Sequence, residues 1–166
     1  MIAALAVAAL AVVALLVVAA VRQTPEQPRP VPIASVPAPQ ADGDACRALL
    51  NVLPERLGDY QRATPADPAP AGAAAWQSES QTDPVILRCG LERPVDFVAG
   101  TPVQVVDEVS WFRIGEEGRS TWITVDRPAY VALTLPDGSG PTPIQLISTA
   151  VADAMPAVPP TPGPAR

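Results

Sequence analysis

The sequence contains no histidine and no lysine among its 166 residues, and it has only two cysteines, Cys46 and Cys89. The absence of histidine excludes Ser–His and Cys–His nucleophilic pairs and removes the commonest protein ligand of metals. The glycine-rich phosphate-binding motifs and the G-x-S-x-G nucleophile elbow are absent as well. We therefore expect no metal site, no cofactor and no histidine-based catalysis.

Positive charge is scarce, because 11 arginines face 17 acidic residues and the net charge is −6. A nucleic-acid-binding domain needs a basic footprint, which this composition does not supply. The exclusive use of arginine, together with abundant alanine and 22 prolines, indicates a GC-rich genome. We expect no nucleic-acid partner.

Two adjacent carboxylate pairs, Asp107/Glu108 and Glu116/Glu117, are the remaining candidates for catalysis. Both pairs lie in expected turns, where acidic residues are ordinary. A calcium site at either turn would need more oxygen ligands than the local spacing offers. We therefore expect a protein that is not an enzyme, and a hydrolase that uses carboxylates is the alternative.

Residues 2–21 are uninterrupted alanine, valine, leucine and isoleucine. As a helix, 20 such residues would span roughly 30 Å, enough to cross a bilayer core. We expect residues 1–22 to be a single transmembrane anchor with the following domain outside the cytoplasm, so that the membrane is one partner. Arg22 opposes this orientation weakly. A signal cleaved near residues 18–20, giving a secreted protein, is the first alternative, and a misassigned start codon is the second.

Composition divides the rest of the chain. Residues 23–44 carry six prolines and predict a semi-rigid linker. Residues 45–155 form the expected extracytoplasmic domain, and residues 156–166 are a proline-rich tail that we expect to be disordered. Within the domain, residues 58–83 predict a long, partly mobile loop in which Trp76 packs at the domain edge.

The two cysteines lie in the two most regular stretches of the domain. Residues 84–91 predict a strand with Leu87 and Cys89 on its core face. Residues 44–53 predict a short helix that contains Cys46 and begins at Asp44 as N-cap. If the helix and the strand pack core face to core face, the cysteines form a disulfide worth about 4 kcal/mol. Two buried, unpaired thiols are the alternative.

Alternating apolar residues predict further strands at 103–106, 109–114, 119–125 and 130–135, and residues 142–155 predict a second amphipathic helix. We expect an α+β fold: a small antiparallel sheet of about four to five strands with two helices on one face, preceded by a single transmembrane helix.

The face of this sheet away from the helices is the predicted binding surface. Alternation assigns Ile123, Leu133 and similar aliphatic side chains to the core face. The opposite face would then carry Trp111, Arg113, Trp122 and Tyr130. Aromatic residues with an arginine are enriched in interface hot spots, so we expect this face to bind an envelope protein or glycan. Cross-strand pairs that only stabilise the sheet are the alternative.

Several sequence blocks together resemble one protein family. They are C-R-A-L-L-x-x-L-P-x-x-L (residues 46–57), P-V-I-L-R-C-G-L-x-R-P (84–94), V-S-W (109–111) and D-R-P-A-Y-V-A-L-T-L-P (126–136), with Trp76 between the first two. The chain resembles the actinobacterial family catalogued as domain of unknown function 3515. The resemblance implies a secreted or membrane-anchored protein of the cell envelope and implies no catalytic residues. Together with the composition it predicts a non-catalytic binding or accessory module.

Overall fold

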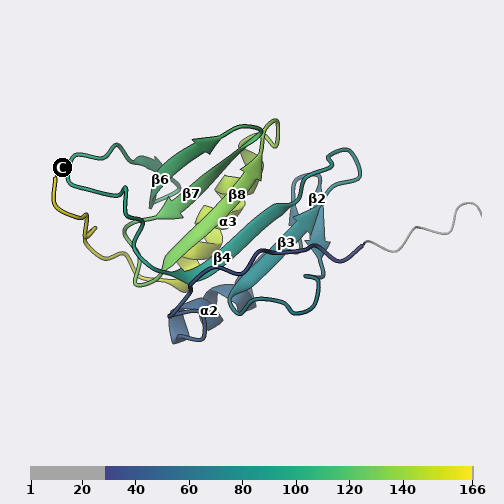
Figure 1. Cartoon of the computed structure of the whole chain (residues 1–166), viewed down its shortest axis with the longest axis horizontal. Helices are drawn as coiled ribbons and strands as arrows, with labels where there is room; N and C mark the ends of the chain where they lie inside the picture. Colours follow the sequence, from purple (N-terminus) through teal and green to yellow (C-terminus); the bar gives the residue numbers. More distant parts are fainter. Residues whose placement is uncertain (1–28, 166) are drawn as a thin grey trace, which may run out of the picture.

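The computed structural model describes residues 29–165, and these form one eight-stranded antiparallel sheet with two helices (Figure 1). The order across the sheet is β1-β2-β3-β4-β8-β7-β6-β5. The strands are β1 (Arg56–Leu57), β2 (Tyr60–Ala63), β3 (Ala73–Gln77), β4 (Val85–Leu91), β5 (Gln104–Val106), β6 (Val109–Glu116), β7 (Arg119–Thr124) and β8 (Tyr130–Pro136). The helices are α2 (Asp44–Val52) and α3 (Thr142–Ala154).

The predicted sheet of four to five strands is wrong, because the described sheet has eight. The additional strands β1, β2 and β3 lie in residues 56–77, most of which we predicted to be loop. They are short, and β3 begins with three alanines, which have low strand propensity. Tertiary packing explains why they form: Trp76 in β3 is fully buried, and its Nε1 donates a hydrogen bond to the Pro54 carbonyl oxygen at 2.9 Å.

Both helices contribute to the main core on one side of the sheet. This core holds apolar residues of α2 and α3 together with Trp76, Leu87 and Leu133 from β3, β4 and β8. The structure contains the predicted disulfide, which joins Cys46 of α2 to Cys89 of β4 with their Cα atoms 5.6 Å apart. The disulfide therefore fixes α2 to the middle of the sheet.

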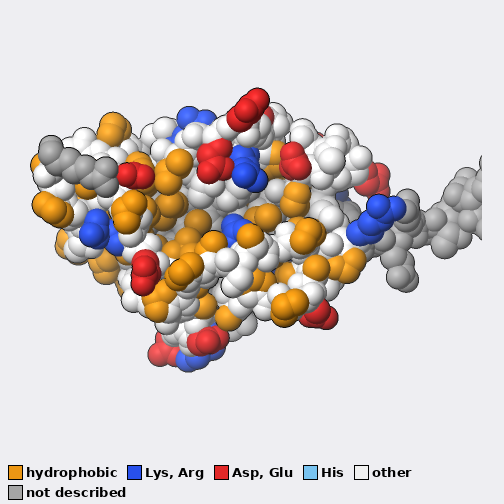
Figure 2. All heavy atoms as spheres, viewed as in Figure 1, with side chains coloured by type: hydrophobic (Ala, Val, Ile, Leu, Met, Phe, Trp, Pro, Cys, Tyr) orange, Lys and Arg blue, Asp and Glu red, His pale blue; other side chains and the backbone are white. Residues whose placement is uncertain are grey.

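The side of the sheet away from the helices is also covered, which the sequence did not lead us to expect. At one end, Phe97 of the β4–β5 connection packs on Phe112 of β6, with ring centroids 5.9 Å apart. At the other end, Val31 and Ile33 pack on alanines of β2 and β3. Apolar side chains line a hollow between these two covered regions (Figure 2). The strands bury apolar residues on both faces as a result.

The segment that provides Val31 and Ile33 is the described part of the predicted linker. It crosses the front of β3 and β4 in Figure 1 and ends beside Gly90, whose carbonyl oxygen accepts the Gln40 backbone N–H at 3.1 Å. A Cβ atom at Gly90 would lie 2.2 Å from the Ala41 nitrogen, so only glycine permits this approach. We call residues 31–41 the N-terminal strap.

The terminal segments also differ from the linker and tail that we predicted from the sequence. Gly163, in the tail predicted to be disordered, forms a parallel bridge with Val98, and the Val158 N–H bonds the Asp126 carbonyl oxygen at 2.9 Å. The predicted transmembrane helix over residues 2–21 lies outside the described residues. Between residues 29 and 165, neither helix combines the length and the apolar character that a bilayer crossing requires.

Candidate functional site

The four residues predicted to form one binding face are not on one face of the sheet. Trp122 is paired with Arg113 in the β6–β7 register and with Leu133 in the β7–β8 register. Directly opposed residues of an antiparallel pair point to the same side, so Arg113 and Trp122 point to the helix side with Leu133. Trp111 is fully buried in the main core, whereas Tyr130 packs in the outer cluster around Phe97.

Strand register explains this difference from the sequence-based assignment. We placed Ile123 on the same face as Leu133, but Ile123 is paired with Ala132 and faces the outer side. A change of one residue in register moves a whole strand's side chains to the other face. The register is set where the β7–β8 connection closes: the Thr124 hydroxyl accepts the Val131 N–H at 2.9 Å and donates to the Ala129 carbonyl oxygen at 3.3 Å.

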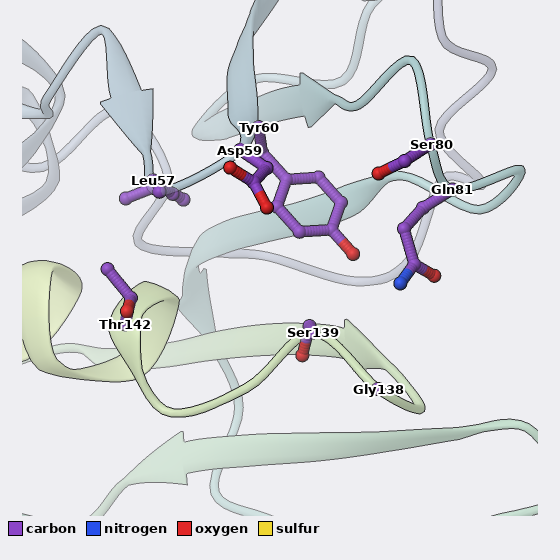
Figure 3. A pocket seen from close by; sticks show the side chains of 9 residues that line it. Leu57, Asp59, Tyr60, Ser80, Gln81, Gly138, Ser139 and Thr142 are labelled. Atoms are coloured by element: carbon purple, nitrogen blue, oxygen red, sulfur yellow. The ribbon is translucent and has the colours of Figure 1, made fainter.

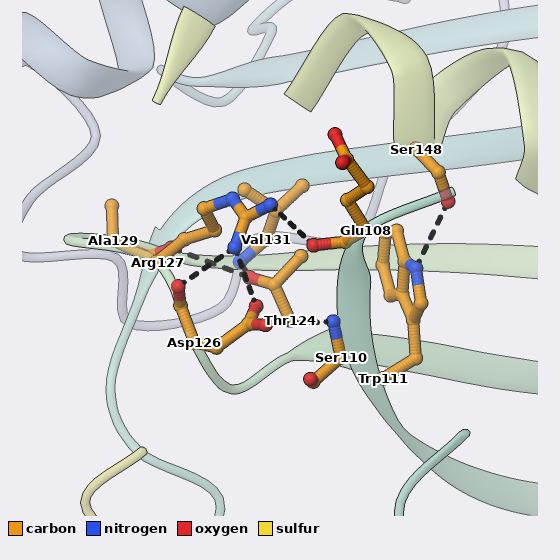
Figure 4. A network of polar contacts seen from close by, with 9 residues as sticks. All are labelled: Glu108, Ser110, Trp111, Thr124, Asp126, Arg127, Ala129, Val131 and Ser148. Atoms are coloured by element: carbon orange, nitrogen blue, oxygen red, sulfur yellow. Dashed lines mark hydrogen bonds and ion pairs between the residues drawn. The ribbon is translucent and has the colours of Figure 1, made fainter. Parts of the chain in front are cut away.

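A buried ion pair lies in the same connection and forms the network drawn in Figure 4. Nη1 of Arg127 lies 2.9 Å from Oδ1 of Asp126, and Nη2 donates to the Glu108 carbonyl oxygen at 2.8 Å. Oδ2 of Asp126 accepts the Ser110 backbone N–H at 3.0 Å. These contacts join the β7–β8 connection to the β5–β6 turn. We interpret the network as structural, because its polar contacts tie the two connections to each other, to β6 through Ser110 and to the C-terminal segment through Val158.

The carboxylate pairs considered for catalysis lie in two separate turns. Asp107 and Glu108 are the two residues of the β5–β6 turn, and both have positive φ, 45° and 68°. Glu116 ends β6 and pairs with Arg119 across the β6–β7 hairpin at 2.8 Å. Within residues 29–165, no group of three or more acidic or cysteine side chains is arranged to hold a metal ion.

A polar pocket of about 170 Å³ lies where the β1–β2 turn, the β3–β4 connection and the β8–α3 loop meet (Figure 3). Asp59 comes from the first of these segments and Tyr60 from the start of β2 beside it, while Ser80 and Gln81 come from the second segment and Ser139 from the third. Leu57, Gly58, Gly138 and Thr142 complete the lining. We call this the Tyr60 pocket. Hydroxyl, amide and carboxylate groups from three distant parts of the sequence converge there.

The β1–β2 hairpin positions the two residues that contribute most to this pocket. Leu57 is paired with Tyr60, so Gly58 and Asp59 are the two residues of a tight turn. Gly58 has φ +66°, which suits the first central position of a type II′ turn and disfavours any other residue. The turn places the Asp59 carboxylate beside the phenol of Tyr60 (Figure 3).

Tyr60 has the most unusual environment in the pocket. The residue is 2 % exposed, yet its hydroxyl has no hydrogen-bond partner among the described residues. In Figure 3 the hydroxyl points towards the side of the pocket where Ser80 and Gln81 lie. Burial raises the pKa of the phenol above its ordinary value of 10.0, and the charges of Asp59 and Asp83 raise it further. The phenol is therefore neutral at physiological pH and can both donate and accept a hydrogen bond.

Trp122 borders a second cavity, of about 370 Å³, on the other side of the β8–α3 loop. Its indole Nε1 donates to the Ser120 hydroxyl at 3.1 Å, and the Arg113 guanidinium lies over the ring at 5.5 Å from the centroid. Val106, Leu135 and Ile144 add apolar surface to the lining. We call this the Trp122 cavity. Of the four predicted binding residues, Trp122 lines the Trp122 cavity, whereas Trp111, Arg113 and Tyr130 line neither the Trp122 cavity nor the Tyr60 pocket.

Sequence reasoning missed the Tyr60 pocket because it treated residues 58–83 as loop. One local signal was present: Gly58-Asp59 between the apolar residues Leu57 and Tyr60 is a two-residue hairpin turn. No local signal showed that Ser80 and Ser139, which are far apart in the chain, would lie beside that turn. Their proximity depends on the pairing of β4 with β8 in the middle of the sheet.

Comparison with known protein families gives a match over most of the chain. Residues 5–160 match the model of the family described as "Protein of unknown function (DUF3515)". The match covers most of the chain and confirms the resemblance inferred from the sequence blocks. No curated protein and no solved structure matches the chain.

Proposed function

This chain belongs to the family described as Protein of unknown function (DUF3515), and we propose that it is a non-catalytic binding module of the cell envelope, located outside the cytoplasm. Its ligand is a small polar group that enters the Tyr60 pocket. The binding role rests on one observation, the buried hydroxyl of Tyr60 that has no partner at the edge of that pocket.

The physical argument starts from the cost of leaving a polar group buried without a hydrogen bond. Such a group destabilises a fold by about 1–3 kcal/mol, so an unpartnered group needs an explanation. The oxygen is shielded by its neighbours as they stand, and a ligand hydroxyl or amine that displaces them from the pocket wall would provide the missing hydrogen bond. The hydroxyls of Ser80 and Ser139 and the amide of Gln81 offer further donors and acceptors to the same ligand.

The charge of the pocket limits the ligand class. Asp59 is the one charged residue in the described lining, so the pocket favours neutral or cationic groups over anions. The alternative function, a carboxylate-dependent envelope hydrolase, needs two carboxyl groups within about 10 Å of each other around the reacting bond. The described lining of the Tyr60 pocket supplies one carboxylate, Asp59, whereas Asp83, whose charge also acts on Tyr60, lies outside that lining. The lining itself therefore does not present the pair that such a hydrolase requires.

Two observations support a location outside the cytoplasm. The domain is held by a disulfide between Cys46 and Cys89, and disulfides persist mainly in oxidising compartments. Residues 2–21 are an uninterrupted apolar run, long enough as a helix to serve as an anchor or an export signal. We propose a membrane-anchored protein, with secretion after cleavage as the second possibility.

Protein-observed NMR with small probe molecules tests the proposed pocket. The probes are glycerol and ethanolamine as neutral and cationic polar molecules, with acetate as the anionic control. We expect glycerol or ethanolamine to shift backbone NMR signals of Tyr60 and Ser139 in the wild type but not in Tyr60→Phe, and acetate to shift neither. Equal shifts in both proteins, or no shift with any probe, would overturn the proposal.

A topology reporter tests the location. An enzyme that is active only outside the cytoplasm, fused after Arg166 of the full chain, should be active in growing cells. A well-expressed but inactive fusion, with an active control fusion to a known exported protein, would place the domain in the cytoplasm and contradict this part of the proposal.

A further inference from the structure

The Tyr60 pocket and the Trp122 cavity are adjacent, because Gly138 and Ser139 of the β8–α3 loop line both. A ligand that extends past this loop therefore contacts both spaces. The Trp122 cavity, at about 370 Å³, lies within the size range of about 300–1,000 Å³ for small-molecule sites. The Tyr60 pocket, at about 170 Å³, has the size of a side pocket for one part of such a ligand.

The two spaces differ in chemistry. The Tyr60 pocket offers hydroxyls, an amide and a carboxylate. The Trp122 cavity offers an aromatic ring and aliphatic side chains, with Ser120, Asp137 and Gln145 among its polar groups. Because the indole N–H of Trp122 is already bonded to Ser120, the side chain presents its apolar ring to a ligand and not a hydrogen-bond donor. The complete ligand must therefore combine an apolar face with hydroxyl or amide groups at its edge.

The charged residues in and beside the two spaces restrict the class of ligand further. The lining of the two spaces includes Asp59 and Asp137 and no arginine. Anionic ligands such as phosphates and uronic acids are disfavoured by these carboxylates. The Arg113 guanidinium already lies over the Trp122 ring, so a cationic ligand at that ring would meet a like charge. A neutral ligand satisfies both conditions.

We propose that the Tyr60 pocket and the Trp122 cavity together bind a neutral glycan. A pyranose ring has C–H groups on one face and hydroxyls at its edge, so one sugar ring packs on the indole of Trp122 while a hydroxyl of the neighbouring sugar bonds Tyr60. The Asp59 carboxylate accepts hydrogen bonds from that same sugar. This inference rests on the proposed binding function of the Tyr60 pocket and names its ligand class.

Isothermal titration with defined oligosaccharides tests the inference on the folded, disulfide-bonded protein. The neutral probes are cellotriose, maltotriose and tri-N-acetylchitotriose, and trigalacturonic acid is the anionic probe. We expect at least one neutral trisaccharide to bind and trigalacturonic acid not to bind. The Kd should rise about tenfold or more in Trp122→Ala and stay within about threefold in Trp122→Phe, which keeps an aromatic ring.

Leu146→Ala is the matched control, because Leu146 is exposed on α3 and lines neither space, so its Kd should equal that of the wild type. Thermal unfolding of each variant shows whether it is folded. If Trp122→Ala unfolds, Tyr60→Phe provides the test, because it removes the hydroxyl that the neighbouring sugar bonds and should also raise the Kd. Failure of all neutral trisaccharides to bind, equal binding of trigalacturonic acid, or no effect of Trp122→Ala would overturn the glycan inference.

The oligosaccharide titration tests the glycan inference independently of the small-probe NMR experiment, which tests the proposed function. If glycerol or ethanolamine binds at Tyr60 while no trisaccharide binds, the proposed function stands and the glycan inference is wrong. If neither the small probes nor the trisaccharides bind, both are wrong.

Discussion

Nε1 of Trp111 in β6 donates a hydrogen bond to Oγ of Ser148 in α3 at 3.0 Å, and both side chains are fully buried (Figure 4). This contact ties the second strand from one sheet edge to the helix that covers it. It assigns Trp111 to the core, although the sequence-based hypothesis placed it on a binding surface. The same bond satisfies the one polar atom of the indole, which explains how a tryptophan is accommodated there.

Trp111→Ala should therefore lower the free energy of unfolding by about 3–5 kcal/mol, the range for removal of a large buried aromatic. Urea denaturation followed by circular dichroism measures the change. Arg113→Ala, two residues along the same strand and exposed, is the control and should change stability by less than about 1 kcal/mol. A Trp111→Ala protein as stable as the control would mean that this side chain is not part of the core.

Replacement of both disulfide cysteines by alanine should destabilise the domain by about 2–5 kcal/mol. The bond links positions 43 residues apart, so its loss greatly increases the freedom of the unfolded chain. Urea denaturation of wild type and variant measures the difference, and mass spectrometry of non-reduced peptides checks the link itself. Free, alkylatable thiols in natively folded protein would contradict the assignment.

Gly90→Ala should destabilise the protein more than Gly100→Ala does. Both glycines have φ +89°, so both substitutions carry the same backbone strain, about 1–2 kcal/mol. The added Cβ at Gly90 would also collide with the backbone of Ala41, whereas Gly100 has open space around it. The difference between the two variants reports the contact of the N-terminal strap with β4. Equal destabilisation would show that the strap does not pack on Gly90 in solution.

Hydrogen exchange in the N-terminal strap is a second measurement of the effect of Gly90→Ala. Hydrogen exchange at Gln40 and Ala41 should accelerate in Gly90→Ala and remain slow in Gly100→Ala, because their N–H groups bond within or beside the strap in the native structure. Unchanged protection in Gly90→Ala would show that the strap accommodates the methyl group.

Tyr60→Phe should leave stability near pH 7 unchanged or raise it by about 1 kcal/mol, because it removes a buried hydroxyl that has no partner. Above pH 10 the two proteins should differ in their pH dependence. The phenol pKa is raised in the folded state, so the folded wild type holds its proton more tightly than the unfolded chain. The free energy of unfolding of the wild type therefore keeps its full value while the pH is below the pKa that Tyr60 has in the unfolded chain. It falls as the pH rises above that pKa.

Urea denaturation from about pH 9 to about pH 11 measures this effect. The fall in stability across that window should be smaller in Tyr60→Phe than in the wild type. Tyr130→Phe, which removes the chain's other tyrosine, is the matched control. Identical pH profiles for the wild type and Tyr60→Phe would show that the Tyr60 phenol is not buried as described.

The strands after residue 84 and the two helices were predictable from the sequence because their patterns are local. Apolar side chains alternate along residues 84–91 and recur at helical spacing along α3. The type of each element can therefore be predicted from the residues of that segment alone. The cysteine pair and the short apolar helix around Cys46 made the disulfide predictable on the assumption that core faces meet. The sequence blocks were sufficient to identify the family as well.

The strands β1, β2 and β3 and the orientation of the aromatic residues were not predictable in this way. The three strands are short and poor in strand-forming residues, and they form because Trp76 and Tyr60 are buried when the sheet assembles. The binding-face prediction failed because period-2 alternation shows which residues of one strand share a face but not which face of the next strand they join.

The sequence by itself determined the family, the paired cysteines and the strand-and-helix content of the second half of this protein. The tertiary structure alone decided that Trp122 points to the helix side and that Tyr60, Ser80 and Ser139 meet in one pocket. The physical reason is that helix and strand periodicities are local properties, whereas register and the packing of connections depend on contacts between residues far apart in the chain.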